Sequence, residues 1–325
     1  MASAASIVDV GQEEDGGIFV QRGCQLCSRN GFELEPGAQV DQSFGRIDVG
    51  WEIPLLGLTL NAVPPDAVPG AIDEDTAVVT LTHVDYRSAS IHDMRVINNA
   101  AHSAGALMVW DLSHSAGAIE LDLDGTGCDL AVGCGYKYLN GGPGAPAFLF
   151  VARRLQDELQ SPLQGWMGHA EPFAFDDNYR PAGGILKFLT GTPSILALAA
   201  LEAGLGTFSG IDMRDVAAKS RQLSQLFIDK VETRCGSEVR LASPRDPAAR
   251  ASHAVFAHPE GYAVMQALIA RGVIGDFRPP DHMRFGFAPL YNSFADMVRA
   301  AEILADILAT RQWDQPRFKE RAKVT

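Results

Sequence analysis

The sequence predicts an α/β protein: a large domain built on a mostly parallel sheet, followed by a smaller C-terminal α+β domain. Continuous apolar runs of strand length recur at residues 76–82, 106–110, 128–132 and 147–151. Runs that are continuous rather than alternating are typical of strands with both faces covered. A helical pattern separates the first two runs, and such alternation favours parallel pairing. From about residue 210 long amphipathic helices dominate.

These patterns divide the chain into three parts. Residues 1–60 are Gly-rich and acidic with weak periodicity, so we expect an atypical, partly irregular N-terminal segment. Residues 61–210 are predicted to form the large domain, and residues 211–325 the small one.

The remaining elements are predicted from the spacing of apolar residues and from the position of proline. A short strand is expected at 54–60, and Met283 to Phe287 alternates as an edge strand does. Val255 and Phe256 suggest one more strand. Helical spacing, with a proline near the start of the second segment, predicts helices at 91–103, 193–205, 212–232, 261–271 and 294–311.

Composition excludes several classes of function. The 325 residues carry a net charge of -13 and no basic block, which argues against nucleic acid and anionic membranes as partners. No apolar run reaches membrane-spanning length, and the acidic first 20 residues do not resemble a signal peptide. Five cysteines, an odd number, indicate reduced thiols in the cytoplasm. Cys24 and Cys27 have metal-ligand spacing but no second pair nearby, so we predict incidental thiols and no metal.

Polar residues follow three of the predicted strands. Thr82, Asp111 and Lys137 each lie at or just after a strand end. In an open parallel sheet ligands bind beyond the carboxyl ends of the strands, so these residues together predict a site. Taken alone, Asp111 could be a helix cap or turn residue, and Lys137 a solvated surface lysine.

The flanks of Lys137 favour a functional reading. Tyr136 and Tyr138 bracket it, and glycines on both sides permit close backbone approach. The segment 140–144 lacks the spacing of nucleotide-binding loops and is interpreted as a rigid turn behind the lysine.

This combination suits pyridoxal 5'-phosphate (PLP). A lysine amine forms a Schiff base with PLP, and a carboxylate such as Asp111 keeps the pyridine nitrogen protonated so that the ring accepts electrons. His114 lies three residues after Asp111, and a tight loop would bring both to the cofactor.

Five motifs resemble kynureninase, a fold-type I, aminotransferase-like family of PLP enzymes. They cover residues 109–117 (VWDLSHSAG), 135–144 (GYKYLNGGPG), 165–173 with Gly-Trp-Met-Gly-His and Pro-Phe, 191–193 (GTP) and 284–291 (RFGFAPLY). The resemblance runs from about residue 71 to about residue 308. It implies hydrolysis of L-kynurenine, or of 3-hydroxykynurenine, in tryptophan catabolism and NAD biosynthesis. The expected products from L-kynurenine are anthranilate and L-alanine.

The resemblance also implies residue roles. Lys137 is similar to the lysine that holds PLP, and Asp111 to the carboxylate on the ring nitrogen. Tyr136 matches a tyrosine that contacts the phosphate and assists proton transfer. Arg284 resembles the guanidinium that binds the substrate α-carboxylate. The remaining cofactor-binding residues are Thr82 and His114 from the same chain, and Trp166 and Thr192, which reach the phosphate from the neighbouring subunit of a homodimer.

Two alternatives stay open. Residues 1–60 do not contain the family's N-terminal turns, its ring-stacking aromatic residue or its Phe-Pro-(Thr/Ser)-Asp motif. The chain could therefore be a catalytically impaired relative that keeps the fold and the dimer interface. Another fold-type I enzyme, such as a cysteine desulfurase, would use a cysteine on a mobile loop, for which Cys235 is the candidate.

Overall fold

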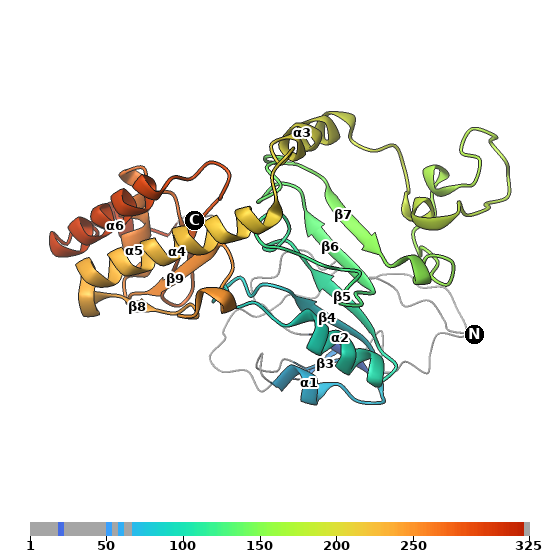
Figure 1. Cartoon of the computed structure of the whole chain (residues 1–325), viewed down its shortest axis with the longest axis horizontal. Helices are drawn as coiled ribbons and strands as arrows, with labels where there is room; N and C mark the ends of the chain where they lie inside the picture. The colour runs from blue at the N-terminus through green and yellow to red at the C-terminus, as the bar shows by residue number, and fades with distance from the viewer. Residues whose placement is uncertain (1–18, 23–49, 54–57, 62–66, 322–325) are drawn as a thin grey trace.

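Continuous apolar runs form the strands of a five-stranded sheet in the computed structural model (Figure 1). The structure describes residues 67–321 together with the backbone of residues 19–22, 50–53 and 58–61. Cys24, Cys27 and most of the segment 1–60 lie outside the described residues. The strand order is β1-β4-β5-β6-β7, with bounds Phe19–Arg22, Thr76–Thr82, Leu107–Asp111, Leu130–Cys134 and Ala147–Val151.

The centre of this sheet is parallel and its two outer pairings are antiparallel. Strands β4, β5 and β6 run in one direction, whereas β1 and β7 run against their neighbours. The predicted parallel core is therefore confirmed. Strand β6 lies two residues later than the expected 128–132, because buried Asp129 turns its carboxylate to the backbone N–H of Met108.

Helix α2 (Met94–Ser103) covers one face of the sheet, beside the short helix α1 (Val68–Ala71). It begins at Met94 rather than Ile91, because the Asp93 side chain accepts from the N–H of Val96 as an N-cap, and Ile91 forms a β-bridge with Val84. The core between helix and sheet is fully apolar apart from paired polar groups. Its members include Val79, Leu81, Ile97, Met108 and Trp110.

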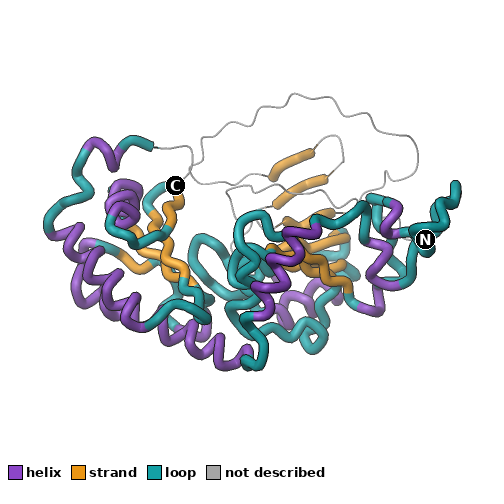
Figure 2. Tube along the Cα trace, turned by 90° about the horizontal axis from the view of Figure 1, so that it is seen from above, coloured by secondary structure: helices purple, strands orange, loops and turns teal. Residues whose placement is uncertain are grey.

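A second core lies in the C-terminal domain, which packs beside the first sheet (Figure 2). Its antiparallel sheet has the order β10-β11-β9-β8. The strands span Asp276–Arg278 (β10), His282–Gly286 (β11), His253–Ala257 (β9) and Arg240–Leu241 (β8). The helices span Met213–Cys235 (α4), Gly261–Ala270 (α5), Phe294–Ala309 (α6) and Pro316–Lys319 (α7). The sequence-based prediction of an edge strand at 283–287 is wrong, because β11 is paired with β10 on one side and with β9 on the other.

The connection from β7 to the second domain is a long excursion. It carries three short 3-10 helices, Arg153–Leu155, Trp166–Gly168 and Gly184–Phe188, and then α3 (Ile195–Gly206). In Figure 1 it loops out beyond β7 and returns with α3 across the top of the sheet. Strands β2 (Gly50–Ile53) and β3 (Leu58–Asn61) pair with each other antiparallel. No helix in the described ranges is long and apolar enough to cross a membrane. The domain limits drawn from the sequence remain a prediction.

Candidate active site

Three of the predicted residues lie at one edge of the parallel sheet. Thr82 ends β4 and is the register partner of Asp111, which ends β5. Asp111 in turn pairs with Val132 of β6, and Lys137 follows the end of that strand at Cys134. Because these strands are parallel neighbours, their carboxyl ends meet at the edge where ligands bind in such folds.

The loop after β5 is held by its own aspartate. Oδ1 of Asp111 accepts a 2.7 Å hydrogen bond from the N–H of Ser113, which is an Asx-type turn. The N–H of Leu112 continues the sheet to the Val132 carbonyl at 2.8 Å. Within residues 67–321, no hydrogen bond of the structure engages Oδ2 of Asp111. One oxygen therefore orients the carboxylate while the other can accept from a ligand.

The Lys137 turn is closed on itself by backbone hydrogen bonds. The N–H of Gly141 donates to the Gly135 carbonyl at 2.9 Å, and the N–H of Asn140 donates to the Lys137 carbonyl at 3.0 Å. Asn140 has a φ of 61°, a left-handed conformation that asparagine tolerates better than most residues. The expected rigid turn behind the lysine is thus present.

Helix α3 supports this turn through close contacts with glycine. A Cβ at Gly135 or Gly141 would lie 3.0 or 2.9 Å from Leu201 Cδ1, and one at Gly204 would lie 2.6 Å from the Asn140 carbonyl. Real Cβ atoms rarely come so close to other atoms, so the helix reaches the turn only because these positions are glycine.

The Lys137 amine is available for chemistry. Within the described part of the chain it makes no ion pair, and its Nζ lies 5.4 Å from the ring centroid of Tyr136. Both residues line an open hollow of about 470 Å³ together with Asn140, Gly142, Thr207, Ile211, Leu290 and Tyr291. The lysine turn therefore meets residues from the C-terminal domain across this hollow.

Two neutral histidines lie beside the lysine at the domain junction. The rings of His114 and His253 are 5.7 Å apart, from the first and second domains respectively. Loss of water on burial, together with the smaller effect of the positive charge of Lys137, lowers the pKa of His114 to about 2. Burial likewise lowers the pKa of His253 to about 4, with Arg284 adding to the effect. Both rings are therefore neutral at pH 7, and the cations of the site are Lys137 and Arg284.

Arg284 lies on β11 at the same junction, but it is already engaged. Its Nε and Nη2 donate to the two carboxylate oxygens of Asp276 at 2.6 and 2.5 Å, and its Nη1 donates to the Tyr86 carbonyl at 2.7 Å. The guanidinium also lies 5.5 Å from the Tyr86 ring centroid. The sequence analysis placed this arginine at the substrate but missed both partners.

Trp166 and Thr192 are not brought to the lysine within one chain. They belong to the excursion between β7 and α3, where Trp166 packs edge-on against Phe173 with centroids 5.6 Å apart. Trp166 is 44% exposed, and Thr192 is exposed as well. Both residues face outward from the subunit that carries them.

Comparison with known proteins bears out the resemblance. The model of the "Kynureninase C-terminal domain" family matches residues 216–304. The kynureninase of Pseudomonas fluorescens is 51% identical over 271 residues, which is 83% of this chain and 65% of that protein. Kynureninases of Burkholderia mallei and Burkholderia pseudomallei are 50% identical over 262 residues, 80% of this chain and 63% of theirs.

The chain is therefore similar to kynureninases over about four fifths of its own length. It spans somewhat less than two thirds of the length of these kynureninase relatives.

Solved structures confirm the fold class alone. A cysteine desulfurase from Thermococcus onnurineus superposes with a TM-score of 0.65 at 20% identity, covering 76% of this chain and 64% of that one. A C-DES variant with glycine covalently linked to its PLP cofactor gives a TM-score of 0.63 at 16% identity, covering 76% and 64%. The chain therefore has the fold-type I architecture that its motifs predicted.

A desulfurase-like cysteine is not supported in this chain. Cys235 is the last residue of α4, is buried, and burial raises the pKa of its thiol to about 11. A nucleophilic cysteine needs an exposed, acidic thiol, which is the opposite environment.

Sequence reasoning missed the residues that join the two domains. Tyr138 was noted only as a neighbour of the lysine, yet its hydroxyl donates to the Ser252 carbonyl at 2.8 Å. Within the C-terminal domain it also missed Asp276, which pairs in register with Arg284 across a hairpin. The Pro-Pro-Asp segment between these two strands was the signal that could have placed Asp276 opposite the arginine.

Proposed function

We propose that this chain binds PLP and hydrolyses L-kynurenine or 3-hydroxykynurenine, giving L-alanine and the corresponding anthranilate. The observation that carries the proposal is the arrangement of Asp111 and Lys137 at the ends of adjacent parallel strands, in a chain half identical to kynureninases. Because the relatives are longer than the matched region, the activity is a proposal for this chain.

The described residues fit PLP at its ring. Among the described residues, Asp111 offers an oxygen without a hydrogen-bond partner and Lys137 an amine without an ion-pair partner, and Lys137 lines an open hollow of about 470 Å³. We propose that Asp111 holds the ring nitrogen, that Thr82, His114 and Tyr136 line the cofactor, and that Lys137 is its covalent attachment point. PLP, when bound, supplies the electron sink for breaking the Cβ–Cγ bond of the substrate.

The chain's own groups then have distinct tasks. Arg284 orients the substrate through its α-carboxylate. The Lys137 amine, once released, moves a proton at the substrate α-carbon, with Tyr136 next to it. His114 remains neutral near both cations, so it can accept a hydrogen bond without adding charge.

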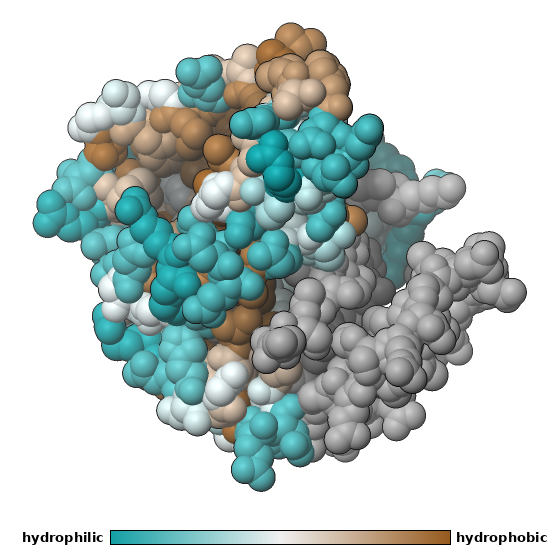
Figure 3. Space-filling model, turned by 90° about the vertical axis from the view of Figure 1, so that its right-hand side faces the viewer, coloured by the Kyte–Doolittle hydropathy of each residue, from teal (hydrophilic) through white to brown (hydrophobic). Residues whose placement is uncertain are grey.

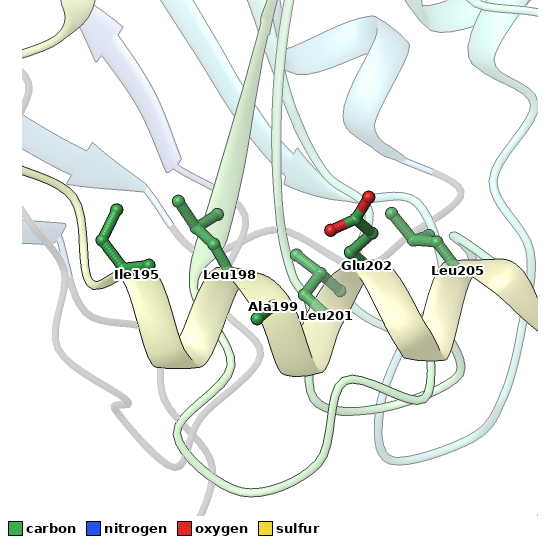
Figure 4. Close-up of a pocket in the computed structure, with 6 residues that line it drawn as sticks. All are labelled: Ile195, Leu198, Ala199, Leu201, Glu202 and Leu205. Carbon is green, nitrogen blue, oxygen red and sulfur yellow. The ribbon is translucent and has the colours of Figure 1, made fainter.

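We further propose a homodimer in which Trp166 and Thr192 complete the partner's cofactor site. The support is a large apolar surface on the excursion and α3. Leu196 is 86% exposed, Ile195 65% and Phe175 85%, far more than a monomer of this size usually leaves in one region. Figure 4 draws Ile195, Leu198, Glu202 and Leu205 along one side of α3, and Figure 3 has a brown, apolar area at the top of the molecule, where Figure 1 has α3.

The dimer can be tested by placing a charge on this surface. Leu196→Glu should shift the chain from dimer to monomer in sedimentation, because burying a carboxylate in an apolar interface is costly. Ile274→Glu is the matched control, since Ile274 is 85% exposed on the C-terminal domain. A monomeric wild type would contradict the dimer.

The activity is tested by titrating the purified chain with PLP and following absorbance, then measuring anthranilate release by fluorescence. Lys137→Ala should lower turnover by about a thousandfold, whereas Lys230→Ala on α4 should leave it unchanged. A wild type that binds PLP and dimerises but releases no anthranilate would favour the impaired relative. A wild type that binds no PLP would contradict the proposal.

We also propose a cytoplasmic location, since Cys128, Cys134 and Cys235 are free thiols.

A further inference from the structure

Arg284 is fixed from two sides by groups of different domains. Its β11 position pairs in register with Asp276 on β10, so the side chains lie opposite each other on neighbouring strands. Asp276 binds Nε and Nη2 in the side-on, bidentate manner that guanidinium and carboxylate favour. The Tyr86 carbonyl, in the loop after β4, accepts from Nη1 across 198 positions of sequence.

These contacts leave a defined part of the guanidinium unused. An arginine has five N–H groups, and Asp276 and Tyr86 together take one from each nitrogen. Among the described residues, one N–H therefore remains without a partner on each of the two terminal nitrogens. Those two nitrogens form the end-on face of the guanidinium, which can hold a second carboxylate in a bidentate way.

The charge balance around Arg284 also favours a second anion. Arg278 lies on the same side, with its Nη2 3.9 Å from Oδ2 of Asp276. The two arginines share the single carboxylate of Asp276, which leaves these three groups with a net charge of +1. The neighbouring histidines His114 and His253 are neutral at pH 7, so they neither compete for the anion nor repel the arginine.

We propose that Asp276 is a positioning residue that, with the Tyr86 carbonyl, locks Arg284 so that its end-on face receives the α-carboxylate of an amino acid substrate. The proposal rests on the proposed function for the identity of that substrate. Arg284 is only 12% exposed, and an unpaired guanidinium there would populate several rotamers. Locking removes that entropy cost before the ligand arrives.

The test separates recognition of the carboxylate from the rest of the site. In the PLP-loaded chain, L-alanine and L-alaninamide are titrated and followed by the cofactor spectrum. Asp276→Asn should lower the affinity for L-alanine by about tenfold to a hundredfold. This is the range expected when a charged hydrogen-bonded pair is lost. L-alaninamide has no carboxylate, so its affinity should change less than about twofold. With kynurenine, KM should rise while kcat changes little.

Glu232→Gln is the matched control. Glu232 and Arg245 form another bidentate pair in the same domain, at 2.6 and 3.0 Å, away from the junction. This variant should leave both titrations unchanged. Arg284→Gln removes the guanidinium that would bind the carboxylate. Adding Asp276→Asn to this variant should therefore cause no further loss of affinity for L-alanine. If Asp276→Asn folds poorly, Arg284→Lys is titrated in its place. Lysine keeps the positive charge but cannot form the side-on, bidentate contact with Asp276.

Either of two titration results would overturn the proposal: an unchanged affinity for L-alanine in Asp276→Asn, or an equal loss of affinity for L-alanine and L-alaninamide. Crystal structures of the wild type and Asp276→Asn give a readout that does not need the cofactor. Arg284 should be ordered between Asp276 and Tyr86 in the first and should move in the second. An unmoved arginine would also overturn it. Failure of the wild type to bind PLP would instead count against the proposed function.

Discussion

The hydroxyl of Tyr138 donates a 2.8 Å hydrogen bond to the carbonyl oxygen of Ser252. This bond joins the turn that carries Lys137 to the residue before β9 of the C-terminal domain. Burial raises the pKa of Tyr138 above its ordinary range, so the group stays a donor throughout the neutral range. The two sides of the candidate site are thus held together by a neighbour of the lysine.

Removing this hydroxyl should loosen the junction. Tyr138→Phe should lower the free energy of unfolding by about 1 kcal/mol, the usual value for one hydrogen bond, because the Ser252 carbonyl still accepts from the Phe287 N–H. Urea denaturation measures the change. Tyr291→Phe, at a site 72% exposed, is the control and should be neutral. Equal stability of Tyr138→Phe and wild type would contradict the structural role.

Gly204 should not tolerate a methyl group. Alanine usually stabilises a helix relative to glycine by about 1 kcal/mol, but here its Cβ would lie 2.6 Å from the Asn140 backbone. Gly204→Ala should therefore lower the melting temperature and weaken PLP binding by displacing the Lys137 turn. Gly206→Ala, in the same helix with open space around it, should be neutral or stabilising. If both variants behave alike, the contact with the turn is unimportant.

Asp129 should be the most sensitive carboxylate of the sheet. It is 1% exposed and accepts from the Met108 N–H at 2.7 Å, from His102 Nε2 at 2.9 Å and from Arg154. Asp129→Asn puts an amide donor where acceptors are needed, and should cost about 2–4 kcal/mol of stability by denaturant unfolding. Glu171→Gln removes an exposed ion pair with Arg180 and should cost less than about 0.5 kcal/mol. A small effect at Asp129 would contradict this ranking.

Stability should fall as the solution is acidified below neutrality. Burial lowers the pKa of His83 and of His253 to about 4, and that of His114 to about 2. Between roughly pH 6.5 and pH 4 the unfolded chain therefore binds more protons than the folded one. The contribution of these neutral histidines to the free energy of unfolding is therefore complete above about pH 6.5, and it decreases as the pH falls from 6.5 to 4.

Between about pH 6.5 and pH 4, each of these histidines adds up to about 1.4 kcal/mol per pH unit to the slope of the free energy of unfolding. Urea midpoints measured from pH 7.5 to pH 5 test the slope, and His83→Asn should make it shallower by one such contribution. A flat profile over this range would contradict neutral burial of the three rings.

Local patterns identified much of the fold. Strand β4 and strand β7 have the predicted bounds, since each coincides with a continuous apolar run. Helix starts were less accurate: α2 begins at its Asp93 cap and α3 after Ser194, positions that depend on backbone geometry. The edge assignment of β11 was wrong because alternation reports one covered face and cannot count the neighbours of a strand.

By itself, the sequence determined the parallel sheet, the strand-end position of Asp111 and Lys137, and the resemblance that names their chemistry. These depend on period, strand polarity and motif content, which are local properties of the chain. Only the tertiary structure decided that Asp276 and the Tyr86 carbonyl hold Arg284, that Tyr138 reaches Ser252, and that Trp166 faces away from its own lysine. Such contacts join residues far apart in sequence, and they exist only once the two domains have packed against each other.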